Sequence, residues 1–251
     1  MVIFANKLRF SMLAATLGLC TLVALPQTAH AQFTTFVTGG HADIDVASDE
    51  DQLELAVHND DTDAESDPSE TLFVIGDGGL TTRTAEGQTG SAFDFLGVNA
   101  TDSYFLIKPT GNTLDVPIIG ITSEEIDLTE FQDNIAFNLT GFSGPGTFSA
   151  YETTPSLNVL WRALSNGTIT NNAITSTPSA GHVDYFYGFS APGLYELTVT
   201  ASGTTILGES RTASATYFIN AGAVAVPEAG TVSLMLGGSL TLVGLITRRR
   251  K

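Results

Sequence analysis

The chain contains 251 residues, with 27 acidic and 10 basic side chains and a formal net charge of −17 at pH 7. So acidic a surface repels nucleic acids and other anionic polymers, which excludes nucleic-acid binding and favours cations or a hydrated matrix as partners. The single cysteine, Cys20, has no second cysteine to pair with, so core packing, aided by any bound metal, has to stabilise the fold.

Residues 1–31 have the pattern of a secretory signal peptide. A lysine and an arginine precede an apolar run over residues 11–25, and Ala29 and Ala31 form the small-x-small pattern that signal peptidase recognises. We predict export across the inner membrane of a bacterium, with cleavage before Gln32. Cys20 lies deep inside the apolar run, which argues against its lipidation.

Residues 32–226 are predicted to form one domain with a sizeable core. This part carries 4 of the 10 basic and 26 of the 27 acidic residues, so its net charge is about −22. Short segments with period-two alternation, rich in β-branched and aromatic residues, recur between Gly, Pro, Asn and Asp clusters. This pattern predicts an all-β fold, an antiparallel β-sandwich of immunoglobulin-like or jelly-roll-like topology. The expected strands are residues 42–46, 52–58, 71–75, 104–108, 116–120, 134–139, 147–151, 159–164, 183–189, 194–201 and 213–219.

One short helix is expected over residues 123–131. Ser123 is suited to cap its N-terminus, and Glu124 and Glu125 suit the N-terminal end of the helix dipole.

Residues 60–70 form an acidic stretch between two predicted strands. A solvated, mobile connection is the plainer interpretation. A calcium loop is the alternative, but the glycine and final glutamate of an EF-hand are missing at their required spacings.

Motifs for catalysis are not evident in the sequence. No Gly-x-Ser-x-Gly elbow is present, and nothing singles out a carboxylate pair for glycoside hydrolysis. Trp161 shares one strand face with Val159 and Ala163, which favours a core position over a sugar-stacking platform. We therefore expect a non-enzymatic protein, with a secreted hydrolase as the least favoured alternative.

Residues 227–251 form a tail with three parts. Pro227 and Glu228 precede an apolar segment, residues 231–247, which as a helix would span roughly 26 Å, slightly less than a bilayer core. Arg248, Arg249, Arg250 and Lys251 follow, and we expect these cations to stay in the cytoplasm. A buried helix with a basic surface tail is the alternative.

This tail resembles the PEP-CTERM sorting signal, with Ala229 in place of the family's second proline. The resemblance implies that an exosortase recognises and removes the tail. It further implies that the protein is anchored in the inner membrane before processing and then reaches the cell surface or the exopolysaccharide matrix. A simple membrane anchor is the alternative.

Segments of the predicted domain, taken in order, resemble the choice-of-anchor M domain, a surface-anchored repeat domain. They are residues 40–44, 120–126 with 144–148, and 181–195. The resemblance implies a surface domain that occurs with different anchors. Some relatives accompany metal-type transport systems, which implies such a system as a partner. The family often has a second histidine where this chain has Asp184.

The pattern Gly-His-x-Asp occurs twice, at residues 40–43 and 181–184. In a strand, residues i and i+2 face the same side, so His41 with Asp43 and His182 with Asp184 each present an imidazole and a carboxylate together. We predict that the two motifs converge on zinc or manganese, with His58 as a third imidazole, and regard calcium as less favoured. Alternatively, each histidine only hydrogen-bonds to its neighbouring carboxylate.

The expected function is a surface module that binds a divalent metal or another surface ligand. The alternative is a structural or adhesive component of the extracellular matrix, with surface polysaccharide as its partner.

Overall fold

The computed structural model describes residues 33–111 and 115–222. The predicted signal peptide (1–31), the motif Pro227–Glu228, the apolar segment 231–247 and the basic cluster 248–251 lie outside the described residues. Within residues 33–111 and 115–222, no helix has the length and apolar character needed to cross a bilayer.

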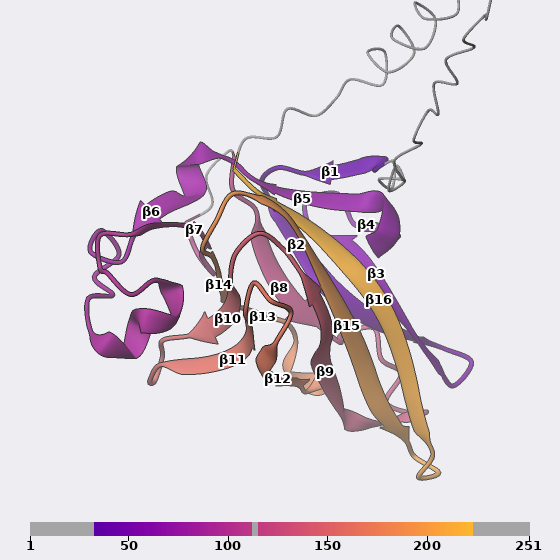
Figure 1. Cartoon of the computed structure of the whole chain (residues 1–251). Coiled ribbons are helices and arrows are strands. Elements are labelled where there is room, and N and C mark those ends of the chain that lie inside the picture. The colour runs from indigo at the N-terminus through magenta and orange to yellow at the C-terminus, as the bar shows by residue number, and fades with distance from the viewer. Residues whose placement is uncertain (1–32, 112–114, 223–251) are drawn as a thin grey trace, which may run out of the picture. The chain divides into compact units, whose positions relative to one another are not determined.

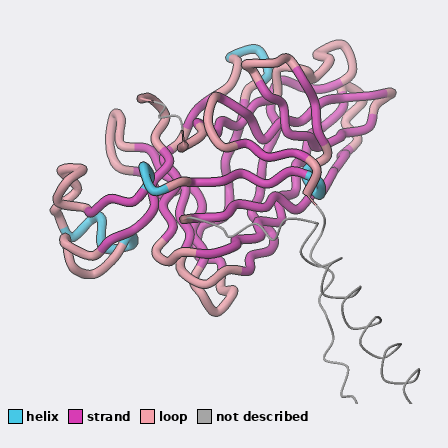
Figure 2. The backbone as a smooth tube through the Cα atoms, turned by 90° about the horizontal axis from the view of Figure 1, so that it is seen from above, coloured by secondary structure: helices cyan, strands magenta, loops and turns pink. Residues whose placement is uncertain are grey.

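The described residues are mainly β-strands, and Figure 2 shows helix only as short turns between them. The short 3₁₀ helices are η1 (Pro68–Glu70), η2 (Asp77–Gly79), η3 (Ser91–Leu96) and η4 (Pro178–Ala180). The strands are β1 (Thr35–Val37), β2 (His41–Asp49), β3 (Gln52–Asn59), β4 (Ala64–Ser66), β5 (Thr71–Ile75), β6 (Leu80–Thr82), β7 (Ser103–Ile107), β8 (Ile118–Thr122), β9 (Phe131–Ser143), β10 (Phe148–Glu152), β11 (Asn158–Ala163), β12 (Ile169–Ser176), β13 (Val183–Asp184), β14 (Phe186–Phe189), β15 (Gly193–Thr205) and β16 (Ser210–Ala221).

The strands form two sheets. The larger has the order β1-β5-β16-β15-β9-β12-β11-β10-β14-β7-β6, and the smaller has the order β13-β8-β2-β3-β4. In Figure 1 the long β15–β16 hairpin runs diagonally across the molecule, next to β3 of the smaller sheet. The predicted all-β class is confirmed.

The predicted antiparallel arrangement holds for most strand pairs, but three pairs are parallel: β1 with β5, β5 with β16, and β2 with β8. Parallel neighbours need long crossover connections. Here β2 and β8 are separated by the strands β3 to β7, and β5 and β16 by most of the chain. The described part has more strands than the seven to nine of an immunoglobulin domain or the eight of a jelly roll.

The core lies between the two sheets. Along β2, Ala42, Ile44 and Val46 are buried on the inner face, while Asp43 and Asp45 alternate onto the outer face. Tyr217 of β16 crosses the core and donates its hydroxyl proton to the carbonyl of Ala56 on β3, at 3.1 Å. The fold is therefore β-sandwich-like, and the outer face of β2 is free to carry a polar site.

Trp161 is fully buried, as predicted. Its indole Nε1 lies 3.4 Å from the carbonyl oxygen of Phe137, to which it donates a hydrogen bond. Trp161 therefore anchors the core and offers no surface for sugar stacking.

All strands expected from the sequence are present, with ends shifted by a few residues. The segment 183–189 divides into β13 and β14, which belong to different sheets. The strands that the alternation did not reveal are β1, β4, β6 and β12. The first three strands have only three residues each, too few to show an alternating pattern. Most side chains of β12 are exposed, so its sequence does not alternate between apolar and polar residues.

The helix predicted over residues 123–131 is absent; the segment forms turns. Ser123 is buried, and its hydroxyl pairs with that of Ser176 at 2.7 Å, so it cannot cap a helix. The amide of Asp127 donates to the hydroxyl of Ser48, at 2.8 Å. The Ser123 hydroxyl and the Asp127 amide thus form hydrogen bonds with residues distant in the chain instead of hydrogen bonds within a helix.

The acidic stretch 60–70 also differs from a mobile connection, because residues 64–66 pair with β3 as β4 and residues 68–70 form η1. Asp67 caps η1 by accepting a hydrogen bond from the amide of Ser69, at 2.7 Å. Pairing with β3 gives the backbone of this stretch hydrogen bonds that a free loop would leave to water.

Candidate metal centre

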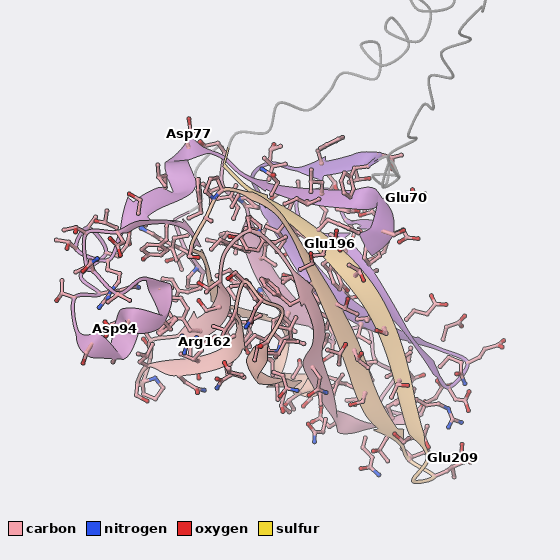
Figure 3. All side chains as sticks on the ribbon, viewed as in Figure 1. Glu70, Asp77, Asp94, Arg162, Glu196 and Glu209 are labelled. Atoms are coloured by element: carbon pink, nitrogen blue, oxygen red, sulfur yellow. The ribbon has the colours of Figure 1, made fainter. Side chains whose placement is uncertain are left out.

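Acidic side chains are spread widely over the molecule. Glu70, Asp77, Asp94 and Glu209 lie at well-separated points in Figure 3, so acidity alone does not locate a site. A candidate site is located instead by histidines that lie next to buried carboxylates. This combination occurs on the outer face of the smaller sheet.

One row of side chains crosses all five strands of this sheet. The strand register pairs Asp184 of β13 with Gly120 of β8, Gly120 with Asp43 of β2, Asp43 with His58 of β3, and His58 with Glu65 of β4. Residues paired in register face the same side of a sheet. The row therefore presents three carboxylates and an imidazole on one face.

His41 lies at the centre of the first group of side chains. Its Nε2 lies 2.9 Å from Oδ1 of Asp184 and 3.2 Å from Oδ1 of Asp43. Its Nδ1 lies 2.8 Å from Oδ2 of Asp60. The ring of His182 meets that of His41 edge to face, with ring centroids 5.0 Å apart. We call His41, Asp43, Asp60, His182 and Asp184 the His41 cluster.

Gly120 allows the two aspartates of this cluster to approach each other across β8. A Cβ on Gly120 would lie 2.2 Å from Oδ1 of Asp43 and 2.8 Å from Oδ1 of Asp184. Both distances are far below van der Waals contact, so any other residue would push the carboxylates aside. This role of Gly120 is not recognisable from the sequence, since a glycine inside a strand also marks bulges and other close packing.

Asp43 is the buried member of the cluster, with 1% of its surface exposed. Its Oδ1 makes no hydrogen bond within the described residues, although Nε2 of His41 is near. Burial, followed by the charge of Asp60, raises the pKa of Asp43 to about 6. A buried carboxylate oxygen without a hydrogen bond, facing an imidazole, fits a cation ligand.

The ligand atoms of His41, Asp43, Asp60 and His182 lie within 4.8 Å of one another. Mixed imidazole and carboxylate donors suit zinc and manganese, whereas calcium is held by oxygen atoms. His182 also has Glu124 nearby, with 3.7 Å between Nδ1 and Oε2. The donor set therefore fits the metals expected from the sequence.

The fold brings together four of the five predicted ligands: His41, Asp43, His182 and Asp184. It adds Asp60, which the sequence showed only as one of many acids in the stretch 60–70. Asp60 directly follows β3 and reaches His41 on the neighbouring strand β2.

His58, the fifth predicted ligand, belongs to a neighbouring group. Its Nδ1 lies 2.5 Å from Oε1 of Glu65, and its Nε2 lies 3.5 Å from Oδ1 of Asp60. Ligand atoms of His58, Glu65 and Glu125 lie within 4.8 Å of one another, and we call these residues the His58 cluster. Burial alone would lower the pKa of His58, but the hydrogen bond and charge of Glu65 outweigh it and raise that pKa.

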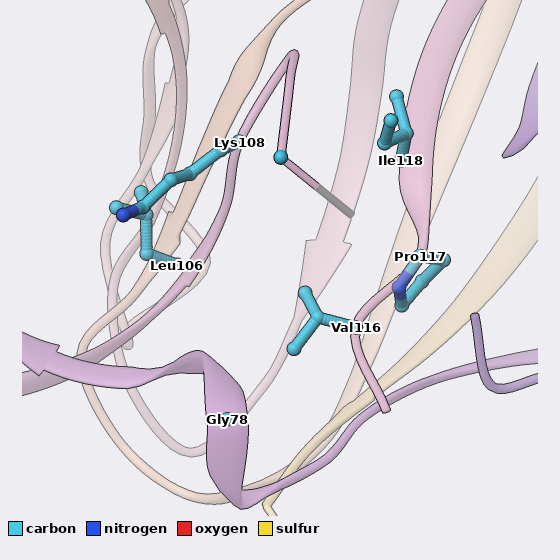
Figure 4. Close-up of a pocket in the computed structure, with 7 residues that line it drawn as sticks. Gly78, Leu106, Lys108, Val116, Pro117 and Ile118 are labelled. Carbon is cyan, nitrogen blue, oxygen red and sulfur yellow. The ribbon is translucent and has the colours of Figure 1, made fainter. Parts of the chain in front are cut away.

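A small pocket of about 70 Å³ lies between η2, β7 and β8 (Figure 4). Its one charged lining residue, Lys108, forms an ion pair with Glu86 at 2.7 Å. No imidazole or carboxylate side chain lines this pocket, so it contributes nothing to a cation site. The lining residues are Gly78, Leu106, Lys108, Gly111, Val116, Pro117 and Ile118.

No protein-family model, curated protein or solved structure matches this chain. The resemblances of the tail and of the domain therefore stay predictions, and the argument for function rests on the geometry above.

Proposed function

We propose that this protein is a non-enzymatic surface module that binds a divalent metal, zinc or manganese, through the His41 cluster. The observation that carries the proposal is the meeting of the two Gly-His-x-Asp motifs. His41 and Asp184 are 143 positions apart in the chain, and their side chains lie 2.9 Å from each other.

The contacts assign different tasks to the two nitrogens of His41. Nε2 faces Asp43 and Asp184, and Nδ1 faces Asp60. Histidines that bind a metal through one nitrogen usually donate the N–H of the other to a carboxylate. We therefore assign Nε2 of His41, His182, Asp43 and Asp184 as ligands and Asp60 as the carboxylate that orients His41.

Export of the module rests on the sequence pattern at both ends of the chain. Signal peptidase would cleave after Ala31, and an exosortase would remove the tail that begins at Pro227, which releases the protein to the cell surface or matrix. A metal transport system at the surface is the partner that the domain resemblance favours.

A structural or adhesive role in the matrix is the second candidate. It is favoured by the net charge of the exported part, about −22, and by carboxylates spread over separate edges of the molecule. Such a surface holds water and binds calcium loosely without a defined site.

Metal binding by the exported protein, purified without a histidine tag, tests the proposal. The wild type should bind zinc or manganese stoichiometrically at micromolar concentration and melt at a higher temperature when loaded. His41→Ala and His182→Ala should lose this binding and the thermal shift, while Glu196→Gln, on the exposed side of β15, should keep both. A wild-type protein without micromolar binding would leave the matrix role as the better explanation.

A further inference from the structure

Asp45 has a buried carboxylate and does not belong to the His41 cluster. Only 1% of its surface is exposed, and neither Oδ1 nor Oδ2 has a hydrogen-bond partner in the described part of the chain. Burying a charged group without partners is costly, so a native structure rarely keeps one without compensation.

The surroundings of Asp45 carry further ligand groups. Asp45 lies two residues after Asp43 on the same face of β2, and its register partner Ala56 lies two residues before His58 on β3. The charged groups that act most strongly on Asp45 are Glu125, Glu65 and His58, which are the members of the His58 cluster. An unpartnered, buried carboxylate thus lies on the same sheet face as a second set of potential ligands, two residues along the register from His58.

The chemistry of this set differs from that of the His41 cluster. It offers one imidazole and three carboxylates, of which Asp45 is buried and Glu65 and Glu125 are exposed. Carboxylates that lie close together repel one another. A divalent cation compensates such repulsion, and an oxygen-rich set favours manganese over softer metals.

We infer that the outer face of the smaller sheet holds a second divalent-cation site, formed by His58, Glu65 and Glu125 with Asp45 as its buried ligand. This inference rests on the proposed function only in that both sites would bind a divalent metal ion. The two sites do not share a ligand.

Asp60 connects the two sites. Its Oδ2 lies 2.8 Å from Nδ1 of His41, and its Oδ1 lies 3.5 Å from Nε2 of His58. The other nitrogen of each histidine faces its own site. Nε2 of His41 faces Asp184, and Nδ1 of His58 faces Glu65. One carboxylate therefore orients both histidines, and its loss should weaken both sites, by about 10- to 100-fold each.

Manganese titration of the tag-free, metal-stripped protein tests this inference, with free Mn²⁺ followed by electron paramagnetic resonance. The wild type should bind two equivalents per chain. Asp45→Asn and Glu65→Gln should each lose one equivalent, Asp184→Asn should lose the other, and Asp60→Asn should weaken both. Circular dichroism melts of the stripped variants verify that they fold.

The outcomes separate the two sites. One equivalent in the wild type, kept in Asp45→Asn and lost in Asp184→Asn, would overturn the second site and leave the proposed function standing. One equivalent lost in Asp45→Asn and kept in Asp184→Asn would leave the second site as the manganese site and exclude manganese from the first. An absence of manganese binding would overturn the second site, whereas zinc binding that His41→Ala removes would still support the first.

Discussion

The burial of the Asp45 carboxylate should destabilise the folded protein when no metal is bound. Burial, followed by the charges of Glu125 and Glu65, raises the pKa of Asp45 from its ordinary value of 3.8 to about 7. Between these values the folded chain binds a proton that the unfolded chain has released. The free energy of unfolding of the metal-free protein should therefore fall as pH rises from about 4 to 7, with the full cost present above pH 7.

We predict that Asp45→Asn raises the melting temperature of the metal-free protein at pH 8 on the order of 5 °C and leaves it nearly unchanged at pH 4. The amide has no charge to bury, and that accounts for the gain at high pH. Thermal denaturation with a chelator at both pH values measures the effect. Equal shifts at pH 4 and pH 8 would show that ionisation of Asp45 is not the cause.

Gly120 is the second residue with a testable role. Gly120→Ala should weaken metal binding at the His41 cluster by at least about 10-fold, because the added methyl group displaces Asp43 and Asp184. Isothermal titration with zinc measures the loss. Gly90→Ala is the matched control, since a Cβ at Gly90 meets no atom within 4 Å. Unchanged affinity in Gly120→Ala would mean that the two carboxylates do not act together.

The division of one predicted strand has a consequence at the scale of elements. Residues 183–189 alternate as a single strand would, yet β13 joins β8 in the smaller sheet while β14 joins β7 and β10 in the larger. This change of sheet places Asp184 beside Gly120 and His182 near His41. The candidate site therefore exists because the chain passes between sheets at Tyr185.

A buried arginine organises another element, the segment that contains η3. Arg83 is 2% exposed and donates to the carbonyls of Gln88 and Gly90, at 3.0 and 2.6 Å, and to the side chain of Asp94, at 2.9 Å. It holds the loop around η3 in place next to β6, at the edge of the larger sheet, whereas the His41 cluster lies on the smaller sheet.

Arg83→Met should lower the free energy of unfolding by about 3 kcal/mol, because the carbonyls and Asp94 lose their donor. Hydrogen exchange should accelerate mainly in residues 84–100, with metal binding unchanged. Arg162→Met is the control, since Nε of Arg162 has no hydrogen-bond partner among the described residues, and it should cost about 1 kcal/mol or less. Uniform acceleration across the chain would contradict a local role for Arg83.

Processing of the tail is a prediction for the whole molecule. In a host with an exosortase, the protein recovered from the cell surface should lack residues 248–251, because the Pro-Glu motif, the apolar segment and the basic cluster together resemble a processing signal. Intact-mass measurement shows the loss directly. Recovery of the full tail would instead indicate a simple membrane anchor.

Replacing Arg248, Arg249, Arg250 and Lys251 with neutral residues should disturb membrane topology or processing, since clustered positive charge next to an apolar segment favours the cytoplasmic side. Protease accessibility of the C-terminus in spheroplasts distinguishes this variant from the wild type.

The all-β class and the positions of most strands could be predicted from the sequence, because alternation of buried and exposed side chains is a local property of a strand. It also pointed to His41, Asp43, His182 and Asp184, since a repeated His-x-Asp pattern places two ligand types on one strand face. Trp161 was recognisable as a core residue for the same reason.

Which strand edges meet could not be predicted from the sequence and is known only from the three-dimensional fold. Pairing of β2 with β8 and of β8 with β13 depends on contacts far apart in the chain, and these pairings gave Gly120 its role. Pairing of β3 with β2 placed His58 opposite Asp43, but pairing with β4 gave His58 its contact with Glu65, and the end of β3 brought Asp60 to His41. Residues 123–131 became turns because Ser123 and Asp127 form hydrogen bonds with distant serines, which local helix signals do not reveal.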